Sequence, residues 1–242
     1  MWLALDTATD RASVALGVQG GRGRSPVVEE HVSGARRHAT TILPLIQELL
    51  RRAGSRLDDL EGIVLSDGPG SFTGLRVGAS VAKAFVHARR LPLWTAPSLL
   101  VRAAGVARAD ALVLAVSNAL RGEVYAAAYR FTADAIRTEM IPSVRRPDDI
   151  VAGSIRPDIV VGEAPAASIR LLAQWVGSPV IEPPEGAPHA ARLLELVGRP
   201  GGAHEVDAVM HWEPLYGRPA EAQARWETAH GRPIPDSVSS PG

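Results

Sequence analysis

Short apolar runs alternate with segments of helical periodicity along this chain. The first half predicts three strands, a helix, a strand, a helix, a strand and the start of another helix, at residues 2–6, 13–18, 27–32, 39–53, 63–65, 74–90, 93–95 and from 97 onward. In segment 39–53 the apolar residues Ile42, Leu45, Ile46 and Leu49 recur at the spacing of one helix face. Ser98 is the expected N-cap of the last helix in this half.

The second half repeats this order. Strands are expected at 111–116, 123–131 and 136–141, then a helix at 147–152, a strand at 159–162, a helix at 166–176, a strand at 180–181 and a helix at 190–197. Two similar halves predict a duplicated α/β fold with a cleft between two lobes. We expect the first lobe to span 1–103 and the second 104–218, followed by a flexible tail at 219–242 that is rich in Ala, Pro, Ser and Glu.

A glycine-rich turn separates strand 63–65 from helix 74–90. Residues 68–74 read Gly-Pro-Gly-Ser-Phe-Thr-Gly, a composition that continues neither a strand nor a helix. Ser71 and Thr73 are candidate caps, and the N–H groups at the start of the helix favour an anion or an acidic partner. No Gly-Lys-Ser/Thr follows, so the turn is not a P-loop. The sequence is compatible both with a purely structural turn and with a turn that binds a ligand or partner.

Composition narrows the function classes. Lys+Arg and Asp+Glu both number 26, so no net charge indicates an autonomous nucleic-acid binder, and Lys83 is the only lysine. The absence of cysteine excludes disulfides, thiolate catalysis and cysteine-ligated zinc. No signal peptide or membrane span is indicated, so a cytoplasmic location is expected.

Five segments carry a resemblance to a known family: 3–9 (Leu-Ala-Leu-Asp-Thr-Ala-Thr), 37–44, 68–78, 121–125 (Arg-Gly-Glu-Val-Tyr) and 213–216 (Glu-Pro-Leu-Tyr). In order and spacing they resemble the bacterial TsaB (YeaZ) family. The resemblance implies an actin/Hsp70/sugar-kinase-like duplicated fold, with two lobes of mixed sheets flanked by helices. It also implies a cytosolic, non-catalytic subunit of the machinery that makes threonylcarbamoyladenosine beside the tRNA anticodon.

The same resemblance implies the partners. A TsaB-like chain pairs with the transferase TsaD and stabilises it, TsaE is a third, ATPase subunit, and the chain forms a homodimer when alone. It reaches tRNA only through the complex. The complex uses ATP, whereas the chain is expected to have no cofactor of its own.

The chain departs from active relatives at their metal and first phosphate positions. Where TsaD-like relatives carry two ligand histidines, residues 97–101 read Pro-Ser-Leu-Leu-Val, so no metal is expected. Asp6 is kept at the end of the first strand, but Ala8 stands where a glycine admits phosphate. Asp6, Thr7 and Thr9 are therefore interpreted as a vestigial loop, in which Asp6 holds the turn by hydrogen bonds.

Two further positions in the second half differ in the same way. Residues 117–121 (Ser-Asn-Ala-Leu-Arg) lack a glycine pair, and Gly162 is followed by Glu163, whose carboxylate would repel phosphate. These changes indicate a fold without catalytic residues of its own.

Partner recognition is therefore expected on helices 39–53 and 74–90. Gly74, Gly78 and Ala82 lie at intervals of four, a small-residue face that admits a neighbouring helix. Replacing Gly78 by leucine is accordingly expected to weaken pairing while the monomer stays folded. The alternative is that these stripes pack on the chain's own sheet, which we expect for half of them. The candidate contacts are Ile42, Leu45, Ile46, Leu49, Gly74, Arg76, Val77, Gly78, Val81, Ala82 and Phe85.

Six residues are assigned to the turn itself: His38, Gly68, Pro69, Gly70, Ser71 and Thr73. His38 either bonds to the turn or is solvated. Arg76 is unfavourable near a helix N-terminus, which favours a partner carboxylate or phosphate.

Two other functions remain as alternatives. An autonomous sugar-kinase-like phosphotransferase or ATPase is compatible with the fold, and tight nucleotide binding by the chain alone would favour it. A metallopeptidase is less compatible because paired ligands are lacking, and zinc content would decide it.

Overall fold

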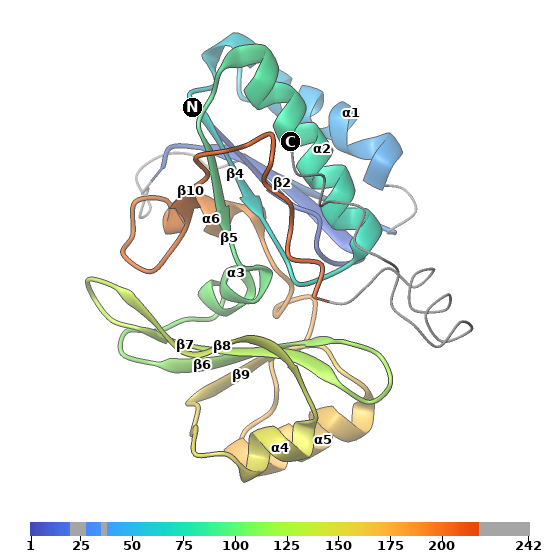
Figure 1. Ribbon diagram of the computed structural model, residues 1–242, viewed down its shortest axis with the longest axis vertical. Coiled ribbons are helices and arrows are strands. Elements are labelled where there is room, and N and C mark those ends of the chain that lie inside the picture. The colour runs from blue at the N-terminus through green and yellow to red at the C-terminus, as the bar shows by residue number, and fades with distance from the viewer. Residues whose placement is uncertain (20–27, 35–37, 218–242) are drawn as a thin grey trace, which may run out of the picture.

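The chain forms two lobes, each built on one β-sheet (Figure 1). The computed structural model describes residues 1–19, 28–34 and 38–217. The tail expected at 219–242 and the strand start expected at residue 27 lie outside these ranges.

The first sheet has six strands in the order β10-β5-β4-β1-β2-β3. Strands β1, β4 and β5 are parallel, whereas β2, β3 and β10 join antiparallel. Helices α1 and α2 cover one face of this sheet, where Leu3 and Leu5 pack with Ile42 and Ile46. The elements are β1 (Trp2–Asp6), β2 (Arg11–Gly17), β3 (Val28–Ser33), α1 (His38–Arg52), a 3-10 turn (Leu57–Asp59), β4 (Gly62–Ser66), α2 (Phe72–Arg89), β5 (Leu93–Ala96) and β10 (His204–Glu205).

The second sheet has four strands in the order β8-β7-β6-β9. Ile181 bridges Val161 of β9 in parallel, so residues 180–181 continue the sheet as an isolated bridge rather than as the predicted strand. Helices α4 and α5 pack on one face of the sheet. The elements are β6 (Leu112–Asn118), β7 (Val124–Phe131), β8 (Ile136–Arg145), α4 (Pro147–Ala152), β9 (Ile159–Gly162) and α5 (Ala166–Val176).

The two lobes share one chain order and one strand order. In each, three antiparallel strands are followed by a helix, a strand parallel to the first, a second helix and a further parallel strand or bridge. The predicted duplication is confirmed, and with it the mixed α/β class of two sheets flanked by helices.

The third helix of each half packs away from its own sheet. Helix α3 (Ser98–Ala104) contacts β6, β7 and β9 of the second sheet, and α6 (Ala190–Leu196) contacts β1, β2 and β4 of the first. Both helices contribute to one core between the sheets, and Figure 1 shows α3 in that space. Helix α3 of the first predicted lobe thus packs on the second sheet, while α6 and β10 of the second predicted lobe pack on the first.

The start of α3 also differs from prediction. Its N-cap is Pro97, and Ser98 is the first helical residue. The Ser98 hydroxyl instead accepts a hydrogen bond from Gly68 N–H at 3.0 Å. Ser98 thus ties the glycine turn to α3 rather than capping the helix.

None of the helices among the described residues is both long enough and apolar enough to span a bilayer.

Candidate functional site

The glycine turn packs directly on the loop that follows β1. Ser71 N–H donates to the Ala8 carbonyl at 2.7 Å, and the Ser71 hydroxyl caps α2 by accepting from Gly74 N–H at 3.3 Å. A Cβ at Gly70 would overlap the Ala8 carbonyl oxygen, so this close approach requires glycine. Of the two predicted caps Ser71 is confirmed, whereas Thr73 lies exposed inside the helix.

The other described turn residues pack against neighbouring parts of the same chain. Gly68 and Pro69 are buried and joined by a cis peptide bond. Gly68 has φ of +111°, and a side chain there would overlap the Leu215 carbonyl. The backbone of His38 begins α1, while its side chain lies outside the described part of the structure.

The vestigial loop is closed over by α2. Asp6 is fully buried, and its Oδ1 accepts a hydrogen bond from Ala8 N–H at 3.1 Å, as predicted for a residue that holds the turn. Thr9 Oγ1 accepts from Arg11 N–H at 3.2 Å. Thr7 is buried beneath the helix, against Gly74 and Gly78. The loop is therefore packed against α2 and held by its own hydrogen bonds.

The small-residue face of α2 points inward, which corrects part of the predicted partner surface. A Cβ at Gly74 would overlap the Thr7 carbonyl oxygen, and one at Gly78 would overlap the Thr7 hydroxyl. Helix–sheet packing within the lobe uses this face, so it is not available to a partner helix. The same correction applies to the other fully buried candidates, namely Ile42, Ile46, Leu49 and Ala82.

Replacing Gly74 by alanine is therefore expected to destabilise the chain itself. The added methyl group meets backbone, which cannot rotate away, so the free energy of unfolding should fall by about 2 kcal/mol. Chemical denaturation measures this loss. Gly54→Ala is the control, because nothing lies within 4 Å of its Cβ position and only its φ of +64° opposes a side chain. Equal stability of Gly74→Ala and wild type would contradict the inward packing. For the same reason, we now expect Gly78→Leu to unfold the lobe rather than only to weaken pairing.

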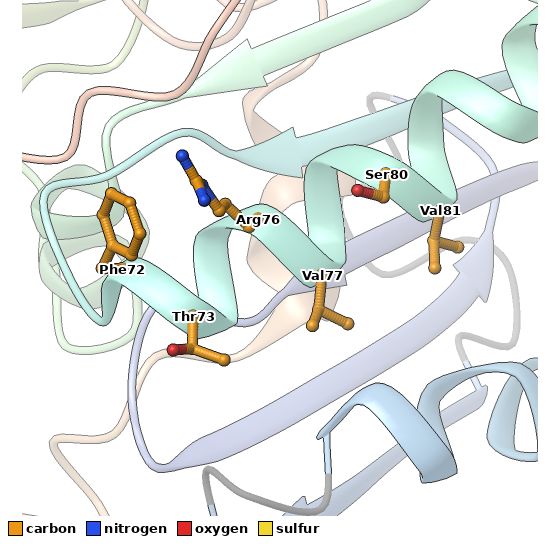
Figure 2. Close-up of a pocket in the computed structure, with 6 residues that line it drawn as sticks. All are labelled: Phe72, Thr73, Arg76, Val77, Ser80 and Val81. Carbon is orange, nitrogen blue, oxygen red and sulfur yellow. The ribbon is translucent and has the colours of Figure 1, made fainter. Parts of the chain in front are cut away.

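The outer face of α2 carries a hollow of about 450 Å³. Figure 2 shows Thr73, Val77 and Val81 along one side of the helix and Phe72, Arg76 and Ser80 along the other. Arg76, Val77 and Val81 were predicted as partner contacts, and Thr73 as a turn residue. Phe72 and Ser80 were not assigned. Leu45 and Phe85, the remaining candidates, are half-buried against the first lobe's core.

Residues 213–216 lie against α2, next to Phe72 and Lys83. Glu213 pairs with Lys83 at 3.1 Å, and the Tyr216 hydroxyl donates to Glu213 at 3.0 Å. The Tyr216 ring lies 4.7 Å from the Phe72 ring, centroid to centroid. This segment therefore contacts Phe72 and Lys83 of α2, which its distance in sequence did not indicate.

Helix α3 carries a buried arginine, Arg102, which binds to residues that follow β9 and precede α6. Arg102 is 2% exposed, and its guanidinium donates to Glu163 Oε1 at 2.9 Å and to the Gly186 carbonyl at 3.1 Å. Glu163 follows Gly162, whose φ of +135° and closeness to the Val116 carbonyl require glycine. The Glu163 carboxylate thus fixes an internal cation in place of facing a phosphate.

The segment that aligns with a second phosphate loop is a tight hairpin. Leu120 N–H donates to Asn118 Oδ1 at 2.9 Å, and Ala119 N–H donates to the Glu123 carbonyl at 3.0 Å. Leu120 and Arg121 have φ of 65° and 53°, in the left-handed region. Because these N–H groups already donate within the chain, the hairpin lacks a ready cradle for phosphate.

Two buried carboxyl groups lie at the ends of β1 and β4. Burial raises the pKa of Asp6 to about 6, against the opposing effect of the Ala8 N–H bond. Burial likewise raises the pKa of Asp67 to about 6, although the charge of nearby His204 lowers it. Among the described residues, no three or more His, Asp or Glu side chains are grouped to hold a metal ion. The neighbours of these carboxyl groups are instead Ser66 and Arg102 for Asp6, and Thr95 and His204 for Asp67.

Comparison with known proteins places this geometry in a family. A family model described as "TsaD: tRNA N6-adenosine threonylcarbamoyltransferase" matches residues 31–166, more than half of the chain. The chain is 37% identical over 131 residues to the "tRNA threonylcarbamoyladenosine biosynthesis protein TsaB" of Escherichia coli, a match that covers 53% of this chain and 54% of that protein. The match thus spans about half the length of this relative.

Longer matches carry the same names. The Bacillus subtilis protein named TsaB is 27% identical over 92% of this chain and 96% of its own length. The solved structure "YeaZ from Pseudomonas aeruginosa" is 28% identical and superposes with a TM-score of 0.66 over 81% of this chain and 90% of that one. The chain belongs to the TsaB (YeaZ) family.

The motifs on which the TsaB resemblance rests lie in the described site, but they do not include the buried residues Arg102 and Asp67. The predicted motifs form the glycine turn, the loop after β1 and the segment that packs on α2. Arg102 was missed because it lies within the apolar helix pattern of α3. Asp67 was missed because it directly precedes the glycines that drew attention. Both residues could have been found in the sequence, because each is a charged residue close to a run of apolar residues.

Proposed function

We propose that this chain is a non-catalytic subunit of tRNA threonylcarbamoyladenosine biosynthesis, the process named in its relatives, and that it pairs with and stabilises the TsaD transferase. The observation that carries the proposal is the Arg102–Glu163 pair: the carboxylate that follows Gly162, where a phosphate would have to approach, is instead bound to a buried arginine. We infer that a chain with this substitution acts through its surface.

The surface proposed for TsaD is the outer face of α2, together with the exposed part of α1. The hollow there is lined by Thr73, Val77, Ser80 and Val81, and on α1 Leu43 is 48% exposed. Apolar side chains in an exposed hollow are typical of a docking site for a helix. The complex uses ATP and includes TsaE, whereas the chain alone is cytoplasmic, homodimeric through the same face and without its own cofactor.

A reconstituted transfer assay tests this proposal. Purified TsaD, TsaE, tRNA, ATP and a threonylcarbamoyl donor are combined with and without this chain. We expect transfer only when the chain is present, and neither transfer nor ATP hydrolysis by the chain alone. Transfer that does not need the chain would contradict the proposal. ATP hydrolysis by the chain alone that falls on replacing Asp6 or Gly162 would favour the phosphotransferase instead.

Replacing Ser80 by tryptophan is expected to weaken binding of TsaD at least tenfold. Ser80 is exposed in the hollow, so the indole would fill the space a partner helix needs without disturbing the lobe's core. Calorimetric titration measures the affinity, and a melting curve checks the fold. Ala88→Trp is the control, since Ala88 is exposed further along the same helix and outside the hollow. Equal affinities of the Ser80→Trp and Ala88→Trp variants would remove the hollow from the interface.

A further inference from the structure

We propose that a second hollow, at one end of the second sheet, binds a phosphate group between Arg108 and Arg199. The hollow has a volume of about 220 Å³ and is lined by the loop after α3, the turn between β7 and β8, and Arg199, which follows α6. Figure 1 shows the β7–β8 turn at the end of the sheet away from the glycine turn. The inference therefore goes beyond the proposed function and does not use the α2 surface.

Arg199 is held in position by the chain itself. Its Nη2 donates to the Thr132 carbonyl at 2.7 Å, and its Cζ lies 5.7 Å from the centroid of the Phe131 ring. The Phe131 side chain is buried in the core between the sheets, so this wall of the hollow is fixed. Because the guanidinium is oriented before a ligand arrives, less side-chain entropy is lost when an anion binds.

Arg108 supplies the second cation together with backbone donors. Its side chain is exposed, and within the described ranges its guanidinium makes no hydrogen bond or ion pair. The backbone N–H groups of Ala107, Arg108 and Ala109 likewise donate to no acceptor among the described residues. Successive N–H groups beside a guanidinium are donors that suit the oxygens of an anion.

The charges around the hollow favour an anion. Among the described residues that line it, two are arginines and none is a carboxylate. The acidic residues in the adjoining sequence lie outside the lining, and one of them, Glu139, pairs with Arg130 at 3.6 Å. Two cations that face one hollow without an anion between them repel each other, and a bound phosphate would replace this repulsion by attraction.

The size of the hollow selects a phosphate group. A volume of about 220 Å³ is smaller than the roughly 300 Å³ at which pockets begin to hold a drug-sized molecule, so a whole nucleoside does not fit. A carboxylate has two oxygens and pairs with one guanidinium, whereas a phosphate has enough oxygens to reach both arginines and the backbone N–H groups. Free phosphate and a phosphate in a nucleic-acid backbone present the same chemistry.

Titration of the isotope-labelled chain with inorganic phosphate at constant ionic strength, followed by nuclear magnetic resonance, tests this site. We expect saturable shift changes at the backbone N–H of residues 107–109 and at the Nε–H of Arg108 and Arg199. Arg108→Gln should weaken binding about tenfold. Arg199→Lys keeps the charge but loses the planar group, and it should also weaken binding, with a melting curve to check its fold. Arg137→Gln is the matched control, because Arg137 is exposed on β8 outside the hollow.

The outcomes decide the site and its ligand. Shifts that grow without saturation, or that saturate equally in the wild type and Arg108→Gln, would overturn the site, and acetate that binds as tightly as phosphate would overturn the phosphate assignment. If tRNA shifts the same N–H groups and phosphate displaces it, the ligand is a backbone phosphate. If tRNA leaves them unchanged while phosphate saturates, the ligand is free phosphate. TsaD is absent from this experiment, so its failure leaves the proposed function standing.

Discussion

Replacing Glu163 by alanine is expected to lower the free energy of unfolding by about 3 kcal/mol. Arg102 is 2% exposed and donates to the Glu163 carboxylate at 2.9 Å. Without that carboxylate the guanidinium stays buried with the Gly186 carbonyl as its remaining hydrogen-bond partner, and an uncompensated buried charge is costly. Urea denaturation measures the loss, and hydrogen exchange in β9 and α3 locates it.

Three variants separate charge burial from other causes. Glu163→Gln keeps an acceptor oxygen and should cost less than Glu163→Ala. Adding Arg102→Met to Glu163→Ala should recover stability, because the buried charge is removed with its partner. Glu48→Ala breaks the ion pair with Arg51 on the surface of α1, at 2.6 Å, and should change nothing measurable. If Glu163→Ala were no more destabilising than Glu48→Ala, the Glu163 carboxylate would not be what stabilises the buried charge of Arg102.

The order of elements could be predicted from the sequence because each element carries a local signal. Trp2–Asp6, Pro147–Ala152, Ile159–Gly162 and Ala166–Val176 have the predicted bounds, since each is a buried run or a periodic segment between clear breakers. The short strand β10 was not predicted. Its two residues are exposed, and they pair with β5 only because α6 brings the chain back to the first sheet.

Which sheet a helix packs on was not predictable from periodicity. The apolar face of α3 is clear in the sequence, but the same face suits either sheet, and the structure places it on the second. The prediction that Gly74, Gly78 and Ala82 of α2 face a partner helix was wrong for a related reason. Small residues at intervals of four indicate that something approaches closely, and here it is the backbone of Thr7 and not another molecule.

The free energy of unfolding is expected to fall by up to about 6 kcal/mol as pH rises from about 3 to about 7. Asp6 and Asp67 each have a pKa raised by burial to about 6 from an ordinary value of 3.8. Between these values the folded chain binds protons that the unfolded chain has released, so stability is greater at the lower pH and is lost as pH rises. A shift of this size corresponds to about 3 kcal/mol for each group. Denaturation at a series of pH values measures the slope.

Substitution by asparagine shows which groups cause this slope. Asp6→Asn keeps the oxygen that accepts from Ala8 N–H, so it should stabilise the chain above pH 6 and remove about half of the slope. Asp67→Asn should remove the other half. Asp134→Asn, at an exposed position, should do neither. Glu29 acts in the opposite direction. Burial raises its pKa, but hydrogen bonds with His189 and Ala191 N–H lower it below the ordinary value of 4.5. Its contribution to stability is therefore present above that ordinary value and is lost as the pH falls below it. A slope that persists in the Asp6→Asn, Asp67→Asn double variant would show that the buried carboxyl groups are ionised at little cost.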